Sequence, residues 1–534
     1  MTTTTEKSTV NTIMMLSSSG QNSLPLQGMK RNHSQIDAEH ANSDADASMF
    51  EDLAAWIRKE GGFVHTAIQF DHEQRVLKVS SPIQEGEEVL RIPRSVLICP
   101  SNIVALDDEN GSSFTWGQLH KQLSKETILQ SVDDSLVAVF LAHKPSSFQP
   151  YLSSLPKRSD LDCIPRRMTD QRLDALFGGS PLVKRVHDQR KRFQREHQAI
   201  QQIQTNSKST MGHLSYEDFD DAMTIISSRA FAGRSADGKE ETTLVPLLDL
   251  CNHERGALSQ KKNLSYEFVS ETAIVRSLGI QSGESLRITY GAQGNQQLLF
   301  NYGFAIPNNI EPDGSSNDAY EFFPESKSGK DDPTTDRSIF LRMGPKSYSY
   351  GCFVQALETF FEQAITTIED EDDGETSSPP EEDDMEAFLN GCDAEEDMNE
   401  DDEVDYGIDA GCLTCSNLGC DGSLSPSKDA ELRALLAFRE KLVHLALSYK
   451  MSQVERQKLL NQKGLSLEYF AAVLVDSELT TLHFFAKAAE GIARQLDSTI
   501  ASKIDPLPTL LSERSVETNY LQELSSAYMT IRHG

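Results

Sequence analysis

Residues 244–253 read LVPLLDLCNH, and residues 283–304 read GESLRITYGAQGNQQLLFNYGF. Asn252 and His253 follow an apolar run, and the second stretch carries Tyr290 and Tyr302. Each piece alone has a structural interpretation, because Asn-His pairs can close turns and buried tyrosines are common in cores with their hydroxyls hydrogen-bonded. Their order and spacing together favour a functional site at which the two segments meet.

The two quoted segments lie in the second of two strand-rich blocks. The first block contains FVHTAIQF and RVLKVSSPIQEGEEVLRIPRSVLICP, which are rich in Val and Ile and broken by Ser-Pro and Glu-Gly turns. The second block adds LVPLLDL, NLSYEFVS, TAIVRSL and SLRITYG as predicted strands. Residues from about 115 to 230 are instead predicted to be helical. We therefore predict an α+β fold in which a β-rich domain, residues 49–310, is split by a helical insert.

The chain after residue 310 is predicted to form a helical domain. ELRALLAFREKLVHLALSYK, SLEYFAAVLV and TLHFFAKAAEGIARQL carry apolar residues at steps of three and four. This pattern predicts an all-α C-terminal domain over residues 311–534, with an acidic, disordered insertion at about 366–428. Residues 1–48 are polar and aperiodic, and we expect them to be disordered as well.

The net charge of −32 comes mainly from that insertion. Residues 369–409 contain 21 Asp or Glu and no Lys or Arg, so the rest of the chain carries about −11. We interpret the acidic run as a solvated loop, with partner binding as the alternative. The remainder lacks the basic face that nucleic-acid binding requires, so no nucleic-acid partner is expected.

The cysteines and the chain ends indicate the compartment. Eight cysteines in 534 residues do not suggest a disulfide framework, and a reducing compartment is expected. No apolar run is long enough to span a membrane. The N-terminal segment lacks a secretion signal, so we expect the cytoplasm or nucleus, with a plastid as the alternative. Four thiols in the acidic region could instead bind zinc, against our preferred interpretation of free thiols and no metal: Cys392, Cys412, Cys415 and Cys420.

The motifs resemble those of the SET-domain protein methyltransferases, in the subgroup that includes Rubisco large-subunit lysine methyltransferase and actin-histidine methyltransferase. That family has an S-R-x-F segment, then P-L-x-D-x-x-N-H, then G-E-x-x-x-x-x-Y-G and a final Y-G-F. The P-I-x-E-G-E-E-V-L-x-I-P stretch and FQPYLSSLP, residues 148–156, agree as well. The matching residues here are Arg229, Pro246, Leu247, Asp249, Asn252, His253, Gly283, Glu284, Tyr290, Gly291, Tyr302, Gly303 and Phe304.

The resemblance implies a β-rich SET fold, S-adenosylmethionine as cofactor and another protein as substrate. It implies that Tyr290 orients the attacking nitrogen and that Tyr302 walls the channel. The methyl acceptor is predicted to be lysine of a non-histone protein, with histidine as the alternative, and the oligomeric state stays open. The residues that the resemblance assigns to the cofactor are Glu73, Gln74, Arg75, Arg229, Asp249, Asn252, His253, Tyr302, Gly303 and Phe304.

One departure from the family concerns its first motif, E-G-x-G, whose glycines let the backbone approach the cofactor. The matching residues here are Glu73, Gln74, Arg75 and Val76, so the acid is present and both glycines are absent. This departure motivates a second hypothesis, a SET-fold pseudoenzyme that binds a protein partner and transfers nothing.

Overall fold

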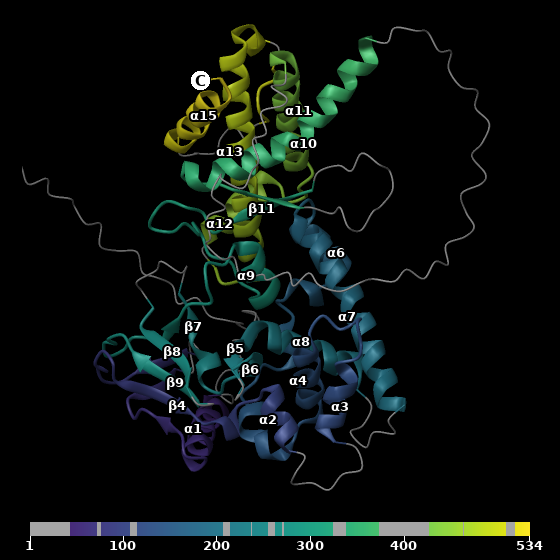
Figure 1. Ribbon diagram of the computed structural model, residues 1–534. Helices are drawn as coiled ribbons and strands as arrows, with labels where there is room; N and C mark the ends of the chain where they lie inside the picture. Colours follow the sequence, from purple (N-terminus) through teal and green to yellow (C-terminus); the bar gives the residue numbers. More distant parts are fainter. Residues whose placement is uncertain are drawn as a thin grey trace, which may run out of the picture.

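A computed structural model shows the chain as two lobes, a lower lobe that contains the large sheet and an upper helical lobe (Figure 1). Most of the acidic insertion, with its four cysteines, and the first 42 residues lie outside the described part of the chain, as do Glu73, Gln74 and Arg75. The described residues are 43–71, 76–106, 115–206, 214–235, 238–254, 262–269, 272–323, 338–372, 427–462, 464–502, 504–508 and 518–533.

The lower lobe is built around an antiparallel sheet with the strand order β1-β4-β9-β8. Three smaller pairs accompany it: β2-β3 and β5-β6 are antiparallel, and β7-β10 is parallel. The strands are β1 (Phe63–Val64), β2 (Ile68–Asp71), β3 (Val76–Val79), β4 (Glu88–Ile92), β5 (Ala230–Arg234), β6 (Glu240–Leu244), β7 (Asn252–His253), β8 (Leu264–Val269), β9 (Thr272–Ser277) and β10 (Arg287–Ile288).

The predicted helical insert is present between the two strand-rich blocks. Helix α8 of this insert begins after Ser215, whose side chain accepts a hydrogen bond from the amide of Asp218, and it ends at Arg229. The helical segments of this lobe are α1 (Ser43–Lys59), η2 (Arg94–Val96), α2 (Pro100–Ala105), α3 (Trp116–Leu123), α4 (Val132–His143), η4 (Ser146–Phe148), α5 (Gln149–Leu152), η5 (Arg158–Leu161), η6 (Pro165–Arg167), α7 (Pro181–Asn206), α8 (Tyr216–Arg229) and η7 (Leu248–Leu250).

The strand prediction for LVPLLDL is wrong beyond Leu244. Strand β6 ends at Leu244, and residues 248–250 form the short helix η7. Pro246 has no amide hydrogen for a sheet ladder, and Leu247 has a φ of +67°, which a leucine rarely adopts. The break places Asp249 in η7 and leaves Asn252 to begin strand β7.

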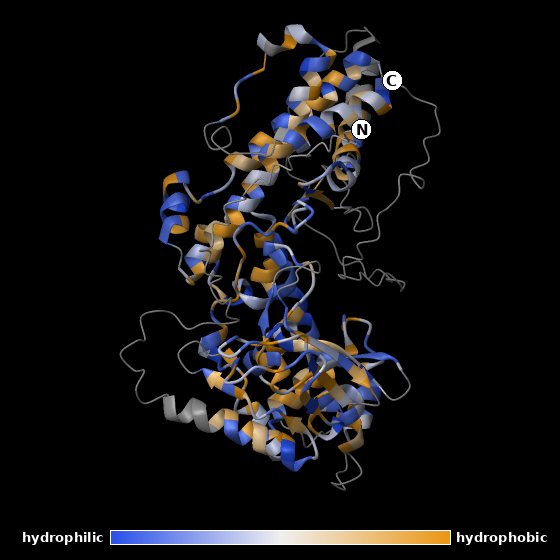
Figure 2. Ribbon diagram, turned by 90° about the vertical axis from the view of Figure 1, so that its left-hand side faces the viewer, coloured by the Kyte–Doolittle hydropathy of each residue, from blue (hydrophilic) through white to orange (hydrophobic). Residues whose placement is uncertain are grey.

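The upper lobe is helical, as predicted, with one addition. Residues 319–322 and 339–342 form an antiparallel hairpin in which buried and more exposed side chains alternate. Hydrophobic and hydrophilic residues alternate along the long helices of this lobe (Figure 2). Its elements are α9 (Asn295–Tyr302), β11 (Ala319–Phe322), β12 (Ile339–Arg342), α10 (Lys346–Asp372), α11 (Lys428–Leu447), α12 (Gln453–Gln462), α13 (Leu467–Leu496), η9 (Ser498–Ser502) and α15 (Thr518–His533).

The upper hydrophobic core includes residues from far earlier in the chain. Helix α6 (Asp170–Phe177) and the start of α7 contribute Leu173, Phe177, Leu182 and Val186, which are fully buried in this core. Helix α9 contributes two more buried leucines, Leu298 and Leu299. The two lobes are therefore joined by packed helices as well as by the chain. No helix among the described residues has the length and apolar character needed to cross a membrane.

Candidate active site

Two cavities lie side by side in the lower lobe, next to the end of α9. The first is a narrow cavity of about 50 Å³. It is lined by Met49, Phe70, Ser154, Pro156, Asp160, Ser228, Arg229, Asp249, Leu250, Cys251, Asn252, Tyr290 and Tyr302.

The second cavity shares part of its wall with the first. Its own lining comes mainly from β5, from the neighbouring strand β8 and from the turn after β10. The lining residues are Ser228, Arg229, Ala230, Phe231, Ala232, Leu248, Asp249, Tyr266, Thr289, Tyr290, Gly291 and Tyr302. Five of these residues also line the first cavity, so the two cavities meet at Ser228, Arg229, Asp249, Tyr290 and Tyr302.

The phenol rings of Tyr290 and Tyr302 stack on each other where the cavities meet. Their centroids are 4.8 Å apart and their planes differ by 27°. The Tyr290 hydroxyl donates a hydrogen bond to the carbonyl oxygen of Cys251 at 2.9 Å. Burial raises the pKa of Tyr302 to about 12 and that of Tyr290 further still. Both phenols are therefore neutral at physiological pH and form a largely apolar wall.

His253 supports this wall from behind and lines neither cavity. Its Nδ1 accepts a hydrogen bond from the Tyr290 amide at 3.0 Å, and its ring lies 4.8 Å from the Tyr290 ring. Burial lowers the pKa of His253 to about 4, so the imidazole is neutral. The structure thus places the His253 side chain against Tyr290. The family resemblance had instead assigned His253 to the cofactor.

Arg229 and Asp249 form a buried ion pair beside the tyrosines. Arg229 Nη1 lies 2.9 Å from the Asp249 carbonyl oxygen and 3.2 Å from its Oδ2. Burial raises the pKa of the Asp249 carboxyl, while the neighbouring guanidinium acts in the opposite direction. Arg229 Nε and Asp249 Oδ1 are buried and have no hydrogen-bond partner among the described residues.

Asn252 supplies a further unpaired group to the first cavity. It lies on β7, which pairs with β10 and so fixes its position relative to Tyr290. Its side-chain Nδ2 is buried and has no hydrogen-bond partner in the described part of the chain. Buried donors without partners are costly. Together with Arg229 Nε, this amide fits a ligand that presents hydrogen-bond acceptors, such as the amino-acid end of S-adenosylmethionine.

Two other residues predicted to contact the cofactor lie away from both cavities. Gly303 ends α9 with a φ of +76°, and a side chain there would meet Cys163 Sγ at 2.8 Å. Phe304 is buried in the upper core, 6.0 Å from the Tyr302 ring. Both residues hold the end of the helix that carries Tyr302.

Several lining residues were not predicted from the sequence as site residues. Ser154 and Pro156 belong to FQPYLSSLP, a segment that agreed with the family but to which no role was given. The rings of Phe231 and Tyr266 meet edge to face, with centroids 5.4 Å apart, in the second cavity. Phe231 ends the S-R-x-F segment, in which only Arg229 had been given a role, and the strand-like context of Tyr266 gave no sign of a site, because aromatic residues are ordinary in strands.

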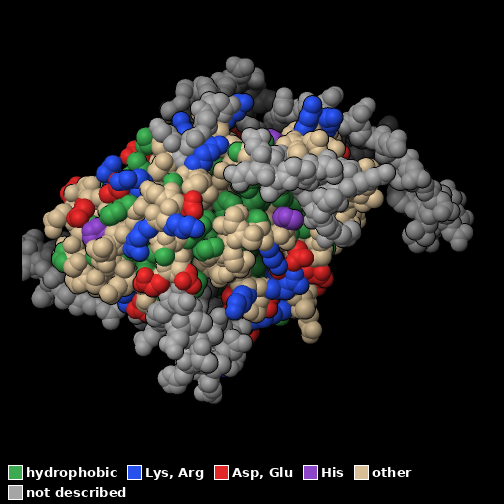
Figure 3. All heavy atoms as spheres, turned by 90° about the horizontal axis from the view of Figure 1, so that it is seen from below, with side chains coloured by type: hydrophobic (Ala, Val, Ile, Leu, Met, Phe, Trp, Pro, Cys, Tyr) green, Lys and Arg blue, Asp and Glu red, His purple; other side chains and the backbone are tan. Residues whose placement is uncertain are grey.

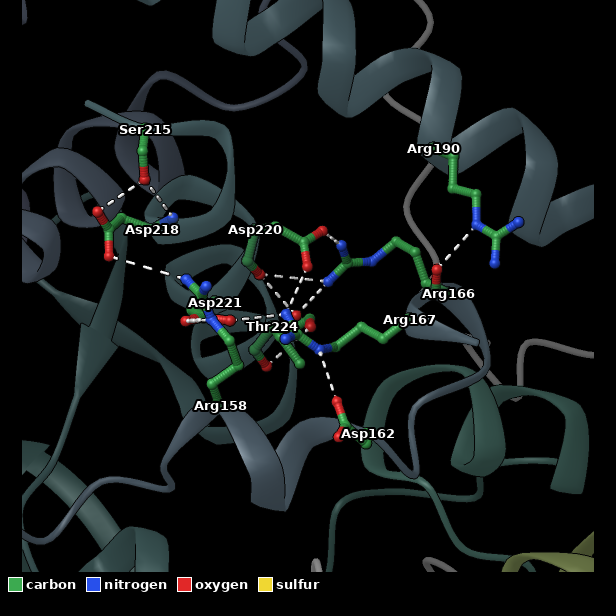
Figure 4. Close-up of polar contacts among 11 residues, drawn as sticks. Arg158, Asp162, Arg166, Arg167, Arg190, Ser215, Asp218, Asp220, Asp221 and Thr224 are labelled. Carbon is green, nitrogen blue, oxygen red and sulfur yellow. Dashed lines mark hydrogen bonds and ion pairs between the residues drawn. The ribbon is translucent and has the colours of Figure 1, made fainter. Parts of the chain in front are cut away.

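An ion-pair network fixes the segment after Pro156 to α8 (Figure 4). Arg166 is buried and pairs with Asp220, and Arg167 Nη1 contacts Asp221 Oδ1 at 2.7 Å. Arg158 Nε contacts the other oxygen of Asp221 at 2.9 Å. The network thereby links the wall that carries Asp160 to the helix that ends in Arg229. Elsewhere on the lower lobe, the face in Figure 3 shows Lys and Arg interspersed with Asp and Glu.

The chain resembles known protein methyltransferases in part of its sequence. No protein-family model matches the chain. The actin-histidine N-methyltransferases of Mus musculus and Homo sapiens are each 26% identical over 272 residues, which is 49% of this chain and 43% of theirs. The chain thus matches less than half the length of these relatives.

Two solved structures cover most of the chain. The SET domain of LSMT bound to lysine and AdoHcy has a TM-score of 0.56 and 18% identity, covering 89% of this chain and 98% of that one. Rubisco LSMT bound to AdoMet has a TM-score of 0.56 and 17% identity, covering 89% and 99%. The predicted resemblance and the predicted SET fold, with its helical C-terminal part, are confirmed.

Proposed function

We propose that the chain transfers a methyl group from S-adenosylmethionine to a side-chain nitrogen of another protein, and that this nitrogen belongs to lysine. The observation that carries the proposal is the meeting of two cavities at the Tyr290–Tyr302 pair. A methyl transfer by direct displacement needs donor and acceptor on one line, each entering from its own side. The bound molecules in the LSMT structures support the same assignment.

The first cavity is the proposed cofactor site. When bound, S-adenosylmethionine supplies a methyl group on a positively charged sulfur. Arg229 would pair with the carboxylate of its amino-acid end, and Asn252 Nδ2 would donate a hydrogen bond to the same end. Both residues offer a buried donor without a partner in the described structure.

The second cavity is the proposed acceptor site. The rings of Phe231, Tyr266 and Tyr302 line it. An amine must be neutral to attack, and an aromatic lining that desolvates the nitrogen would disfavour the ammonium form. The stacked phenols would hold the attacking nitrogen in line, and Tyr290 is fixed for this by Cys251 and His253. A long alkyl chain fits between such rings, which supports lysine.

Histidine is the second candidate acceptor, and the relatives detected by sequence support it. The proteins of mouse and human that match this chain are actin-histidine N-methyltransferases. An imidazole is largely neutral at pH 7, so it needs less help from the cavity to lose a proton.

The test is transfer of a tritiated methyl group from S-adenosylmethionine to the proteins of a matched lysate. We expect a labelled protein whose hydrolysate contains methyllysine; methylhistidine would support the second candidate. The combined change Tyr290→Phe and Asn252→Ala should abolish labelling, whereas Tyr528→Phe, a buried tyrosine of α15, should not. Equal labelling by the double variant and the wild type would contradict the assigned site.

The pseudoenzyme hypothesis rests on Gln74 and Val76, which stand where the family has glycines; Gln74 lies outside the described residues, and Val76 is buried. Calorimetric titration with S-adenosylhomocysteine separates it from the enzyme hypothesis. Saturable binding at micromolar concentration argues for an active cofactor site, and no binding argues for a protein-binding scaffold.

A further inference from the structure

A buried tyrosine outside both cavities touches the ion pair of the site. Tyr151, on α5, is completely buried, and its hydroxyl donates a hydrogen bond to Asp249 Oδ2 at 3.0 Å. The same Oδ2 accepts from Arg229 Nη1 at 3.2 Å. Three segments of the chain therefore converge on one carboxylate oxygen: α5, the end of α8, and η7.

The sharing of Oδ2 determines how the carboxylate is turned. Asp249 Oδ1 is buried and has no hydrogen-bond partner among the described residues. A carboxylate held only by Arg229 could take a wide range of tilts about its last torsion, since terminal torsions of this kind are broad. The hydrogen bond from Tyr151 narrows that range, so the guanidinium meets the carboxylate in one direction.

The protonation state of the Tyr151 hydroxyl is fixed as well. Burial raises the pKa of the Tyr151 hydroxyl well above its usual range, and the nearby Asp249 carboxylate raises it further. The hydroxyl therefore keeps its proton across the physiological range, and the carboxylate remains its acceptor.

We propose that Tyr151 is a positioning residue for the cofactor: through Asp249 it sets the direction in which Arg229 faces the carboxylate of S-adenosylmethionine. The inference rests on the proposed function, because it assigns a role within the same cofactor site. It predicts that Tyr151 affects recognition of the amino-acid end of the cofactor and leaves recognition of the nucleoside unchanged.

The test compares two ligands on the full chain by calorimetric titration. S-adenosylhomocysteine has the amino-acid carboxylate, whereas 5′-methylthioadenosine has the nucleoside and thioether without it. For Tyr151→Phe we expect about tenfold weaker binding of S-adenosylhomocysteine, as for loss of a hydrogen bond to a charged group. The dissociation constant of 5′-methylthioadenosine should stay within about twofold of the wild-type value, since that ligand has no carboxylate for Arg229 to contact.

Tyr528→Phe is the matched control. Tyr528 is also completely buried, and its hydroxyl donates to the buried carboxylate of Glu431 at 2.7 Å, but it lies in the upper core. Both variants should lose similar thermal stability, and only Tyr151→Phe should change the ratio of the two affinities. Asp249→Asn tests the second half of the link: it keeps an acceptor for Tyr151, weakens the ion pair with Arg229, and should likewise weaken binding of S-adenosylhomocysteine while leaving 5′-methylthioadenosine unchanged.

The outcomes separate the two claims. Wild-type protein that binds S-adenosylhomocysteine together with a Tyr151→Phe variant of unchanged affinity overturns the positioning role alone. Equal weakening of both ligands by Tyr151→Phe also overturns it, because a general structural defect would act that way. Wild-type protein that binds neither ligand overturns both the proposed function and the role of Tyr151.

Discussion

His253 Nδ1 accepts a hydrogen bond from the main-chain amide of Tyr290 at 3.0 Å. The imidazole thereby fixes Tyr290, which is one of the residues that line both cavities. The same atom would have to take up the proton if the ring became charged. Protonation of His253 would therefore break this hydrogen bond and place a charge in a buried position.

We first predict that the stabilisation contributed by His253 is lost as the pH falls through the range 6.5 to 4. The folded-state pKa of His253, about 4, is lower than its usual 6.5, so the unfolded chain binds more protons in this range. The stabilisation is complete above pH 6.5 and amounts to at most about 3 kcal/mol. Urea unfolding at pH 4.5 and 7 measures it. His253→Asn, which keeps an acceptor for the Tyr290 amide, should flatten the dependence; an unchanged slope contradicts the role of His253.

A second prediction concerns the Tyr290 hydroxyl. Tyr290→Phe leaves the carbonyl oxygen of Cys251 without its donor and removes the hydroxyl that would hold the attacking nitrogen. We expect kcat to fall by roughly 10- to 100-fold, which corresponds to about 1–3 kcal/mol. Binding of S-adenosylhomocysteine should change little, since Arg229 and Asn252 are unaltered. A variant with full kcat would show that this hydroxyl has no part in the transfer.

A third prediction concerns the network that fixes residues 158–167 to α8. Arg166→Ala removes the more deeply buried of the two arginines that pair with Asp220, which keeps Arg167, and should lower the free energy of unfolding by about 2 kcal/mol. Arg158→Ala is the control, because Arg158 is half exposed and pairs with Asp221 at the surface of the same network. Its cost should be below about 1 kcal/mol. Chemical denaturation of both variants gives the comparison, and equal costs would contradict a special role for the buried arginine.

A fourth prediction concerns Glu478 on α13. This carboxyl is buried and accepts hydrogen bonds from Ser180 Oγ at 2.9 Å and the Tyr449 hydroxyl at 2.8 Å. Burial raises its pKa from 4.5 to about 8. The unfolded chain thus releases this proton first, and the stabilisation present below pH 4.5 is lost as the pH rises to 8.

Glu478→Gln tests this directly, since the amide keeps the shape and does not ionise. The stabilisation contributed by Glu478 should be lost between pH 4.5 and 8 in the wild type, and the variant should lose less over the same range. Parallel curves for the two proteins would mean that Glu478 titrates normally. The predicted contributions of Glu478 and His253 have opposite signs and overlap between pH 4.5 and 6.5, so the difference between each variant and the wild type isolates one group.

The sequence allowed the α+β layout, the helical insert and five residues that line the cavities to be predicted: Arg229, Asp249, Asn252, Tyr290 and Tyr302. These residues stand in short motifs, where order and spacing carry information. The direction in which each side chain points could not be predicted from these motifs. His253, Gly303 and Phe304 belong to the same motifs, but their positions place them behind the cavity walls.

Contacts between distant segments could not be predicted. Tyr151 and Asp249 are 98 residues apart, and a tyrosine in FQPYLSSLP has the appearance of an ordinary core aromatic. The break after Leu244 was missed for a local reason, since LVPLLDL has the composition of a buried strand and only Pro246 and the backbone of Leu247 end it. The cavity walls made by Phe231 and Tyr266 also depend on how two strands come together.

The burial of Leu173, Phe177, Leu182 and Val186 in the upper core bears on how such a protein can be divided by engineering. A fragment cut after residue 310 would expose these four apolar side chains to water and should aggregate. A chimaera with a relative would need α6 and the first turns of α7 to come from the same parent as α13. The unit of exchange is set by shared packing, so it is discontinuous along the chain.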